Sequence, residues 1–347
     1  MLKSYNMNII LITILTLFAF TSCKKTETEK DLTPIKDTVT ADFEIKGISF
    51  VAINSPINNT NITPLENVGS NWIAQMPFAH GYSNSSTLKF NQNSLWWGET
   101  FEGIKITTAL AKQRGIKTML KPQIWIHNSY TGAFVLTNEN DWQQWENNYQ
   151  NYVLGYAHLA DSIGIDMFCI GTELKLVVQN RPAFWNNLID SIKTFYDGKL
   201  IYAANWDDYN LVPFWDKLDY IGIDGYFPLS TSTTPSVEEL VANWQTTITT
   251  IDQFRISQNK DVVFTEIGYK SVDACAHEPW NPTSTTLNLQ AQSNSYQAFF
   301  EAWANKPWFR GAFLWKWYPN HTNAGGSGNI DYTPQNKPAE FILKKCF

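Results

Sequence analysis

The chain has 347 residues, of which 26 are basic and 32 acidic, and its formal net charge is −6. This balance argues against a nucleic-acid-binding protein, because no excess of basic side chains is available to displace counterions from a phosphate backbone. Hydrophobic residues make up 44% of the chain and aromatic residues 15%, which excludes disorder over most of its length. The 15 tryptophans exceed what a core needs, so we expect several of them to face a ligand.

The N-terminal 22 residues have the pattern of an export signal. An apolar stretch at 9–20 follows Lys3 and is shorter than the roughly 20 residues that span a bilayer. Thr21, Ser22 and Cys23 come next and resemble a bacterial lipobox, whose cysteine becomes the lipid-modified N-terminus, although Phe20 stands where leucine is usual. Ordinary secretion without a lipid is the alternative.

We therefore expect residues 1–22 to be a signal peptide that is removed, and Cys23 to carry the lipid. Residues 23–41 are polar and lack apolar periodicity, which predicts a flexible tether ahead of a folded domain at 42–347. Such an anchor would hold an exported domain at a bacterial membrane, and we expect the outer membrane. The sequence leaves open whether the domain faces the periplasm or the cell surface.

Beyond the tether, short runs rich in β-branched and aromatic residues alternate with longer segments of helical period, which favours parallel βα units. We predict eight strands, at residues 45–53, 71–78, 117–126, 167–174, 199–206, 220–227, 262–269 and 311–318. Helical patterns occupy 98–114, 138–163, 181–196, 235–258, 286–305 and 334–345. Eight strands with intervening helices predict a single-domain (β/α)8 TIM barrel.

Two glutamates stand at predicted carboxyl ends of strands, where the chemistry of such barrels is found. From strand alternation we place Glu173 on one face with Met167, Cys169 and Gly171, and Glu266 on one face with Val262, Phe264 and Gly268. We expect both faces to point into the barrel, where a carboxylate without a partner is costly. Two converging carboxyl groups are what glycoside hydrolysis requires. The alternative is that each glutamate is a salt-bridged strand cap.

Several segments resemble glycoside hydrolase family 113, whose characterised members are β-1,4-mannanases within a large clan of retaining (β/α)8 enzymes. The segments are GIKTMLKPQIW, CIGTELK, DYIGIDGYFPL, FTEIGY and GAFLWKWYP, and the likeness spans residues 47–319. The resemblance implies that Glu266 is the nucleophile and Glu173 the general acid/base. In much of the clan an asparagine precedes the acid/base and binds the sugar 2-hydroxyl, whereas this chain has Thr172 there. Asn205, at the end of the fifth strand, is the nearest replacement.

Two polar residues of the sixth strand are further candidates. Tyr226 ends that strand, and a tyrosine there donates to the nucleophile in similar enzymes. Asp224 lies two residues earlier on the same face and could bind substrate. Asp224 could equally pair with a buried cation such as Lys121.

Aromatic residues near strand ends are candidates for sugar binding, because a sugar's C–H faces are apolar and pack on an indole ring. Trp315 and Trp317 are predicted to project from one face of the eighth strand, and we favour Trp315 as the platform under the sugar. Trp125 and His127 leave the third strand on one face and could line a neighbouring subsite, although His127 could be an ordinary loop histidine. Candidates for outer subsites are Trp96, Trp97 and Trp206.

Together these residues favour a lipid-anchored, retaining endo-β-glycosidase that acts on a β-linked polysaccharide or oligosaccharide, with β-1,4-mannan as first choice. The mechanism requires no metal or organic cofactor, and we expect a monomer. The alternative outside the enzymes is a non-catalytic lipoprotein that has the same barrel and only binds glycans. Transglycosylation through the same covalent intermediate also stays open.

Overall fold

The computed structural model describes residues 40–90 and 92–347. The predicted signal peptide, Cys23 and residues 24–39 lie outside this described part. Ala41 belongs to the packed chain, since it is fully buried and donates its backbone N–H to the Cys346 carbonyl at 2.9 Å. No helix in the described ranges is long and apolar enough to cross a membrane.

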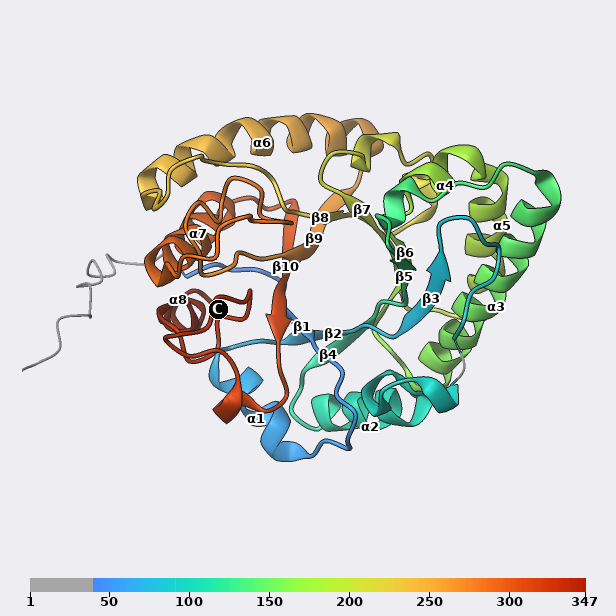
Figure 1. Ribbon diagram of the computed structural model, residues 1–347, viewed down its shortest axis with the longest axis horizontal. Helices are drawn as coiled ribbons and strands as arrows, with labels where there is room; N and C mark the ends of the chain where they lie inside the picture. The colour runs from blue at the N-terminus through green and yellow to red at the C-terminus, as the bar shows by residue number, and fades with distance from the viewer. Residues whose placement is uncertain (1–39, 91) are drawn as a thin grey trace, which may run out of the picture. The chain divides into compact units, whose positions relative to one another are not determined.

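Eight parallel strands close into a barrel in the order β1-β10-β9-β8-β7-β6-β4-β2, which confirms the predicted TIM barrel (Figure 1). The strands are β1 (Ile45–Phe50), β2 (Trp72–Gln75), β4 (Lys117–Leu120), β6 (Met167–Thr172), β7 (Lys199–Asn205), β8 (Tyr220–Asp224), β9 (Asp261–Ile267) and β10 (Phe309–Trp317).

Helices surround the barrel on its outside (Figure 1). They are α1 (Asn59–Asn67), α2 (Phe101–Lys112), α3 (Glu139–Ile163), α4 (Lys175–Asn180), α5 (Pro182–Ile192), α6 (Val237–Gln258), α7 (Leu289–Trp303) and α8 (Pro338–Cys346). The sequence prediction missed α1, a short helix with Pro64 inside it and only Ile62 and Leu65 buried.

Helix α3 shows how the apolar pattern specifies an outer helix. The Asn138 side chain caps its first turn by accepting from the Asp141 N–H at 2.9 Å, and the helix ends at Gly164 with φ 64°. Its aromatic stripe is buried against the barrel and comprises Trp142, Trp145, Tyr149, Tyr152 and Tyr156. These aromatic side chains pack the core and are not available to a ligand.

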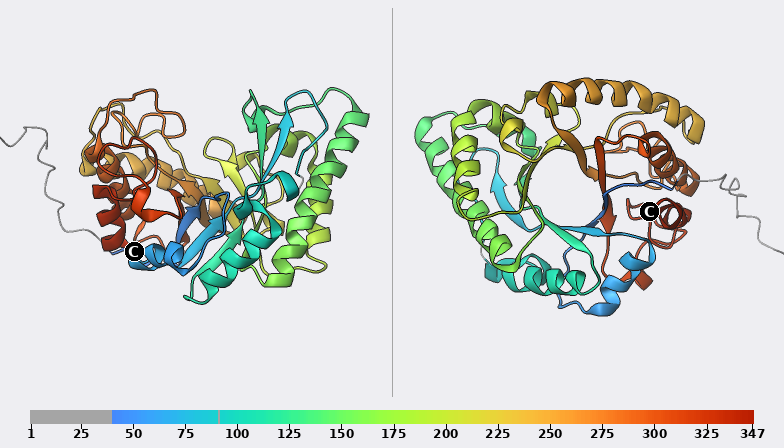
Figure 2. Two further views of the ribbon diagram at one scale, coloured as in Figure 1. Left: turned by 60° about the horizontal axis from the view of Figure 1, so that its bottom comes forward. Right: turned by 180° about the vertical axis from the view of Figure 1, so that it is seen from behind.

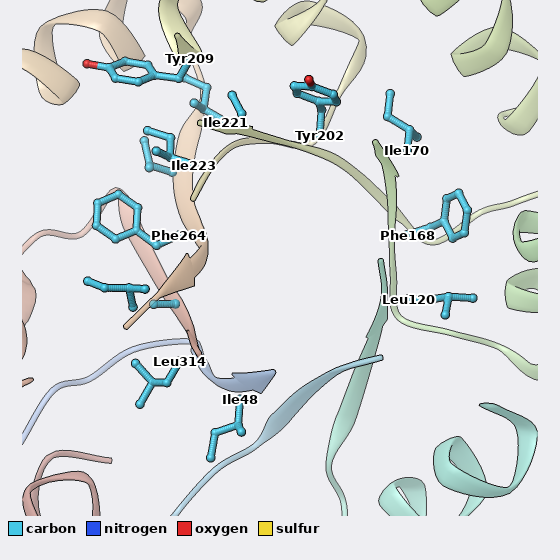
Figure 3. Close-up of a cluster of buried hydrophobic side chains, with 14 of the residues drawn as sticks. Ile48, Leu120, Phe168, Ile170, Tyr202, Tyr209, Ile221, Ile223, Phe264 and Leu314 are labelled. Atoms are coloured by element: carbon cyan, nitrogen blue, oxygen red, sulfur yellow. The ribbon is translucent and has the colours of Figure 1, made fainter. Parts of the chain in front are cut away.

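Two apolar cores stabilise the barrel. The larger core lies between strands and helices, and Figure 3 shows Ile48, Phe168 and Phe264 pointing outward from the ring of strands. The smaller core fills the barrel interior and contains Ile45, Trp72, Ala74, Met119, Met167, Cys169, Ile201, Ala203, Val263 and Phe313. Assignment to one core or the other therefore shows which way each strand residue faces.

The predicted second and third strands are each broken in two. Strand β2 ends at Gln75 and β3 (Phe78–Tyr82) follows, while β4 ends at Leu120 and β5 (Gln123–His127) follows. Pro77 and Pro122 stand at the two breaks, where a residue without an N–H cannot continue the ladder. Strands β3 and β5 pair with each other in parallel and stand beyond the barrel as a separate ribbon (Figure 2).

Candidate active site

A β-bulge in β9 turns Glu266 into the barrel. Ile223 of β8 pairs with Phe264, but the next residue, Asp224, pairs with Glu266, so Thr265 is an extra residue in β9. Phe264 belongs to the outer core and Val263 to the inner one. The prediction that Glu266 shares a face with Phe264 is therefore wrong, and the bulge, not simple alternation, aims the carboxylate inward.

A second irregularity positions Glu173. Cys169 of β6 pairs with Ile201, and Thr172 pairs with Ala203, so β6 has one residue more than β7 over this stretch. Cys169 lies in the inner core, whereas a Cβ on Gly171 would meet the Trp185 and Tyr149 side chains at 2.8 Å on the helix side. The predicted common face of Cys169, Gly171 and Glu173 is therefore wrong.

Glu173 itself comes directly after β6, in the left-handed region with φ 52°. Its N–H donates to the Ala203 carbonyl at 2.8 Å, which holds this backbone against β7. A left-handed glutamate is uncommon, and such conformations cluster at functional sites.

Glu266 accepts hydrogen bonds at both carboxylate oxygens. Its Oε1 accepts from Lys121 Nζ at 2.5 Å and from Gln123 Nε2 at 3.1 Å, and its Oε2 accepts from the Tyr226 hydroxyl at 2.8 Å. The Tyr226 contact is the one that the family resemblance implies. Lys121 comes from the end of β4 and Gln123 from the start of β5, so the break between these strands supplies two of the three donors.

Lys121 bridges two buried carboxylates. Its ammonium group also donates to Asp224 Oδ1 at 3.1 Å, and Thr265 donates to the same oxygen at 2.7 Å. Lys121 and Asp224 are fully buried. Asp224 therefore takes the structural role that the sequence left open, as partner of a buried cation.

Glu266 has the basic partner that the strand-cap alternative requires, but Glu173 does not. In the described part of the chain, the Glu173 carboxyl group takes part in no hydrogen bond or ion pair, and it is partly exposed. The alternative that both glutamates are salt-bridged strand caps therefore fits Glu266 but not Glu173. A pair with one anchored and one unengaged carboxyl group matches a nucleophile beside a proton donor.

The electrostatics favour this division of roles. Although part of the Glu173 residue is exposed, its carboxyl group is largely removed from water, which raises the pKa of Glu173 well above its usual range, and the negative charges of Asp224 and Glu266 raise it further. Burial also raises the pKa of Asp224, with Glu266 adding to the effect. Burial alone would lower the pKa of Lys121, but Asp224 and Glu266 outweigh it and the net shift is upward. Lys121 thus stays charged, and Glu173 keeps its proton to higher pH than an exposed glutamate would.

Other predicted polar residues lie around this pair. Asn205 is half-buried at the end of β7, where its Nδ2 donates to Asp207 Oδ1 at 3.1 Å and its Oδ1 accepts from the Trp206 N–H at 3.0 Å. Its amide is thus engaged with its own loop. Thr172, the residue in place of the clan's asparagine, is buried.

The two tryptophans of β10 do not share a face. Trp315 is partly exposed, whereas Trp317 is fully buried in the outer core, with its ring 5.4 Å from His321. The Trp315–Lys316 peptide bond between them is cis. The prediction of a common face is wrong, and of the two rings only that of Trp315 has exposed surface.

The remaining aromatic candidates differ in exposure. Trp206 is half-buried and stacks on exposed Trp280 at 5.1 Å, and Trp97 is half-buried against the outer core. Trp125 is 57% exposed on β5, and the His127 ring stacks on Tyr82 at 5.1 Å.

Sequence reasoning missed four contributors to the site. In the sequence, Lys121 is a candidate only as a partner for Asp224. Gln123 is not among the predicted residues, although alternation from Trp125 places it on the same face. Tyr130 and Asp208 lie in loops and gave no periodic signal. Tyr130 is 47% exposed and interacts electrostatically with Glu173.

Asp208 is a buried carboxyl group near Glu173. It is 3% exposed, and no described residue hydrogen-bonds its Oδ2. Burial, assisted by Asp207, raises its pKa to about 6. Its charge contributes to the raised pKa of Glu173. Within the described ranges, no group of three or more histidine, cysteine, aspartate or glutamate side chains is placed to hold a metal ion.

The chain is similar in sequence and in fold to known proteins. The sequence model of glycoside hydrolase family 113 matches residues 52–337. The GH113 β-mannanase AaManA from Alicyclobacillus acidocaldarius, solved in complex with ManMIm, is 23% identical, with a TM-score of 0.74 over 87% of this chain and 96% of that one. A GH113 β-1,4-mannanase complex is 24% identical, with a TM-score of 0.74 over 87% and 97%.

A more distant likeness extends to a β-glucuronidase from Ruminococcus gnavus, which is 12% identical, with a TM-score of 0.60 over 88% of this chain and 52% of that one. No curated protein sequence gives a match. The structural likenesses establish the fold of the barrel.

Proposed function

The chain belongs to glycoside hydrolase family 113, and from that premise we propose that it is a retaining endo-β-glycosidase acting on β-linked polysaccharides or oligosaccharides. β-1,4-Mannan is the first choice of substrate, because the similar solved enzymes of the family are named as β-mannanases. The observation that carries the proposal is the pairing of Glu266, anchored by three donors, with Glu173, whose pKa is raised.

The proposed reaction has two displacements. A Glu266 oxygen bonds to the anomeric carbon while the glycosidic bond breaks, and the departing oxygen takes the proton of Glu173. Water then attacks the anomeric carbon and gives a proton to Glu173, and the bond to Glu266 breaks. Tyr226 and Lys121 hold the attacking carboxylate in place, and Trp315 supports the sugar ring at the cleavage point.

Replacing Glu266 with glutamine tests the assignment. Glutamine keeps the side-chain shape and cannot form the covalent intermediate, so hydrolysis should fall at least about a thousandfold while polysaccharide binding remains. Glu102→Gln, at an exposed position on α2, is the matched control and should keep full activity. Incubation of the parent with defined β-glycans, followed by proton NMR from the first minutes, reports the substrate and the first product anomer.

The outcomes separate the candidate functions. Retained anomeric configuration supports Glu266 as nucleophile, and an inverted first product contradicts it. A parent that binds β-glycans but hydrolyses none favours the non-catalytic glycan-binding lipoprotein. Sugar products longer than the substrate would identify transglycosylation.

We further propose that the enzyme is exported and anchored by an acylated Cys23 to a bacterial membrane, with the outer membrane as first choice, and that it is a monomer. Metabolic labelling with a fatty-acid analogue should label the parent and not a Cys23→Ala variant. Equal recovery of both proteins in the soluble fraction would contradict the anchor and favour ordinary secretion.

A further inference from the structure

One face of the β3–β5 ribbon carries a row of aromatic rings. The parallel register pairs Phe78 with Gln123, His80 with Trp125, and Tyr82 with His127. Because side chains alternate along a strand, these six lie on one face and the residues between them on the other. The other face is buried and consists of Ala79, Gly81, Ile124 and Ile126. We call His80, Tyr82, Trp125 and His127 the ribbon face.

The ribbon face is exposed to solvent, whereas the opposite face of the two strands is buried. Trp125 is 57% exposed and Tyr82 is 49% exposed, whereas Ile124 and Ile126 are 6% and 3% exposed. Adjacent exposed aromatic rings on a rigid strand pair are costly in water, and such patches mark ligand-binding surfaces.

Three of the four rings of the ribbon face, those of His80, Tyr82 and His127, contact one another. The His127 ring lies 5.1 Å from Tyr82 with an interplanar angle of 28°, and 5.4 Å from His80 with an angle of 27°. Backbone pairing of β3 with β5 fixes their Cα positions. A surface held in this way loses little side-chain entropy when a ligand binds.

The ribbon face begins at the proposed nucleophile. Gln123 starts β5, lies on the same face and donates to Glu266 Oε1 at 3.1 Å. With a rise of about 3.3 Å per residue, Trp125 lies roughly 7 Å and His127 roughly 13 Å further along the strand. The row therefore leads from the candidate cleavage point out of the barrel, on the scale of successive sugar units.

We propose that the ribbon face is a binding surface for consecutive sugar units of a β-linked neutral polysaccharide next to the cleaved bond. Trp125 stacks on one unit, and the Tyr82–His127 pair contacts the next. Apolar C–H faces of pyranose rings match exposed aromatic rings. The inference rests on the proposed function for the identity of the glycan, whereas the binding itself does not require catalysis.

The first test is electrophoresis of the full chain through gels containing soluble β-mannan or glucomannan. We expect Trp125→Ala and Tyr82→Ala to weaken retardation roughly tenfold in apparent affinity, and Trp125→Phe to restore part of it. Phe341→Ala is the matched control, because Phe341 is 48% exposed on the outer helix α8. It should migrate as the parent does.

The second test is the chain-length dependence of hydrolysis. On manno-oligosaccharides of five or six units, Trp125→Ala should raise KM roughly tenfold while kcat changes less, and the loss in kcat/KM should be smaller on the shortest cleaved substrate, which leaves part of the ribbon face unoccupied. Equal losses on short and long substrates would indicate a structural role and overturn the proposal.

The electrophoresis separates this inference from the proposed function. If the parent hydrolyses nothing but Trp125→Ala loses retardation, the proposed function fails and the ribbon face stands. A Trp125→Ala variant retarded as strongly as the parent, or a parent retarded by neither polysaccharide, overturns the ribbon face whatever the activity.

Discussion

Replacing Lys121 with methionine removes the only charge that the described structure places between Asp224 and Glu266, and leaves a side chain of similar length. The ammonium group donates to Glu266 at 2.5 Å and to Asp224 at 3.1 Å, and it is fully buried. Removing one partner from a buried ion pair costs about 3–5 kcal/mol, because the other charge stays buried without compensation. We expect a loss of at least about 3 kcal/mol in the free energy of unfolding.

The pH dependence of this loss follows from the sign of the pKa shift. Burial and Glu266 already raise the pKa of Asp224 to about 7, and losing Lys121 removes the influence that lowers it. A group whose pKa is higher in the folded than in the unfolded state stabilises the fold fully below its unfolded-state pKa. This stabilisation is lost as the pH rises through its folded-state pKa. The variant should therefore lose more stability at pH 8 than at pH 5.

Thermal melting at both pH values measures the effect, and activity supplies a second readout. The variant also loses the Lys121 hydrogen bond that holds the Glu266 carboxylate, so kcat should fall. The double variant Lys121→Met/Asp224→Asn carries one buried carboxylate fewer and should recover part of the stability. The reasoning is refuted if the loss is equal at the two pH values, or if the added Asp224→Asn destabilises the protein further.

Two other substitutions test the site. Tyr226→Phe removes the 2.8 Å hydrogen bond to Glu266, which contributes about 1.5–3 kcal/mol because the acceptor is charged. We therefore expect kcat to fall about 10- to 100-fold in steady-state assays. A change within twofold contradicts a positioning role for Tyr226. Asp208→Asn removes a charge that raises the pKa of Glu173, so above pH 6 the basic limb of kcat/KM should move to lower pH, and an unmoved limb contradicts the coupling. Because folding raises the pKa of Asp208 to about 6, ionisation of this buried carboxyl group destabilises the parent as the pH rises. In thermal melting, the Asp208→Asn variant should be more stable than the parent at pH 8, by up to about 3 kcal/mol, but not at pH 4.

The barrel could be predicted because its signals are local and repeated. Apolar runs of strand length alternate with helical stripes such as that of α3, and the count of eight admits few other folds. The sequence prediction runs across Pro77 and Pro122, because strand-forming residues resume beyond each proline, so each pair of strands is predicted as one. The signal was present in the prolines, which cannot donate to a ladder.

The site was predicted in position but not in detail. The carboxyl ends of strands identify Glu173 and Glu266, since that placement depends only on where a strand stops. Their facing could not be derived, because each follows an extra residue that reverses the alternation, and no residue type in the sequence marks the reversal. Tyr130 and Asp208 depend on loop paths, which have no periodicity to read.

The extra residue Thr265 lets one strand satisfy two unrelated demands. Before Thr265, the alternation of β9 packs Phe264 against the outer helices. After Thr265, the alternation is reversed, so that Glu266 faces into the barrel. Repacking of the shell can therefore proceed over evolutionary time without rotating Glu266 away from its partners. Deleting that single position would couple the two halves again and send the carboxylate toward the helices.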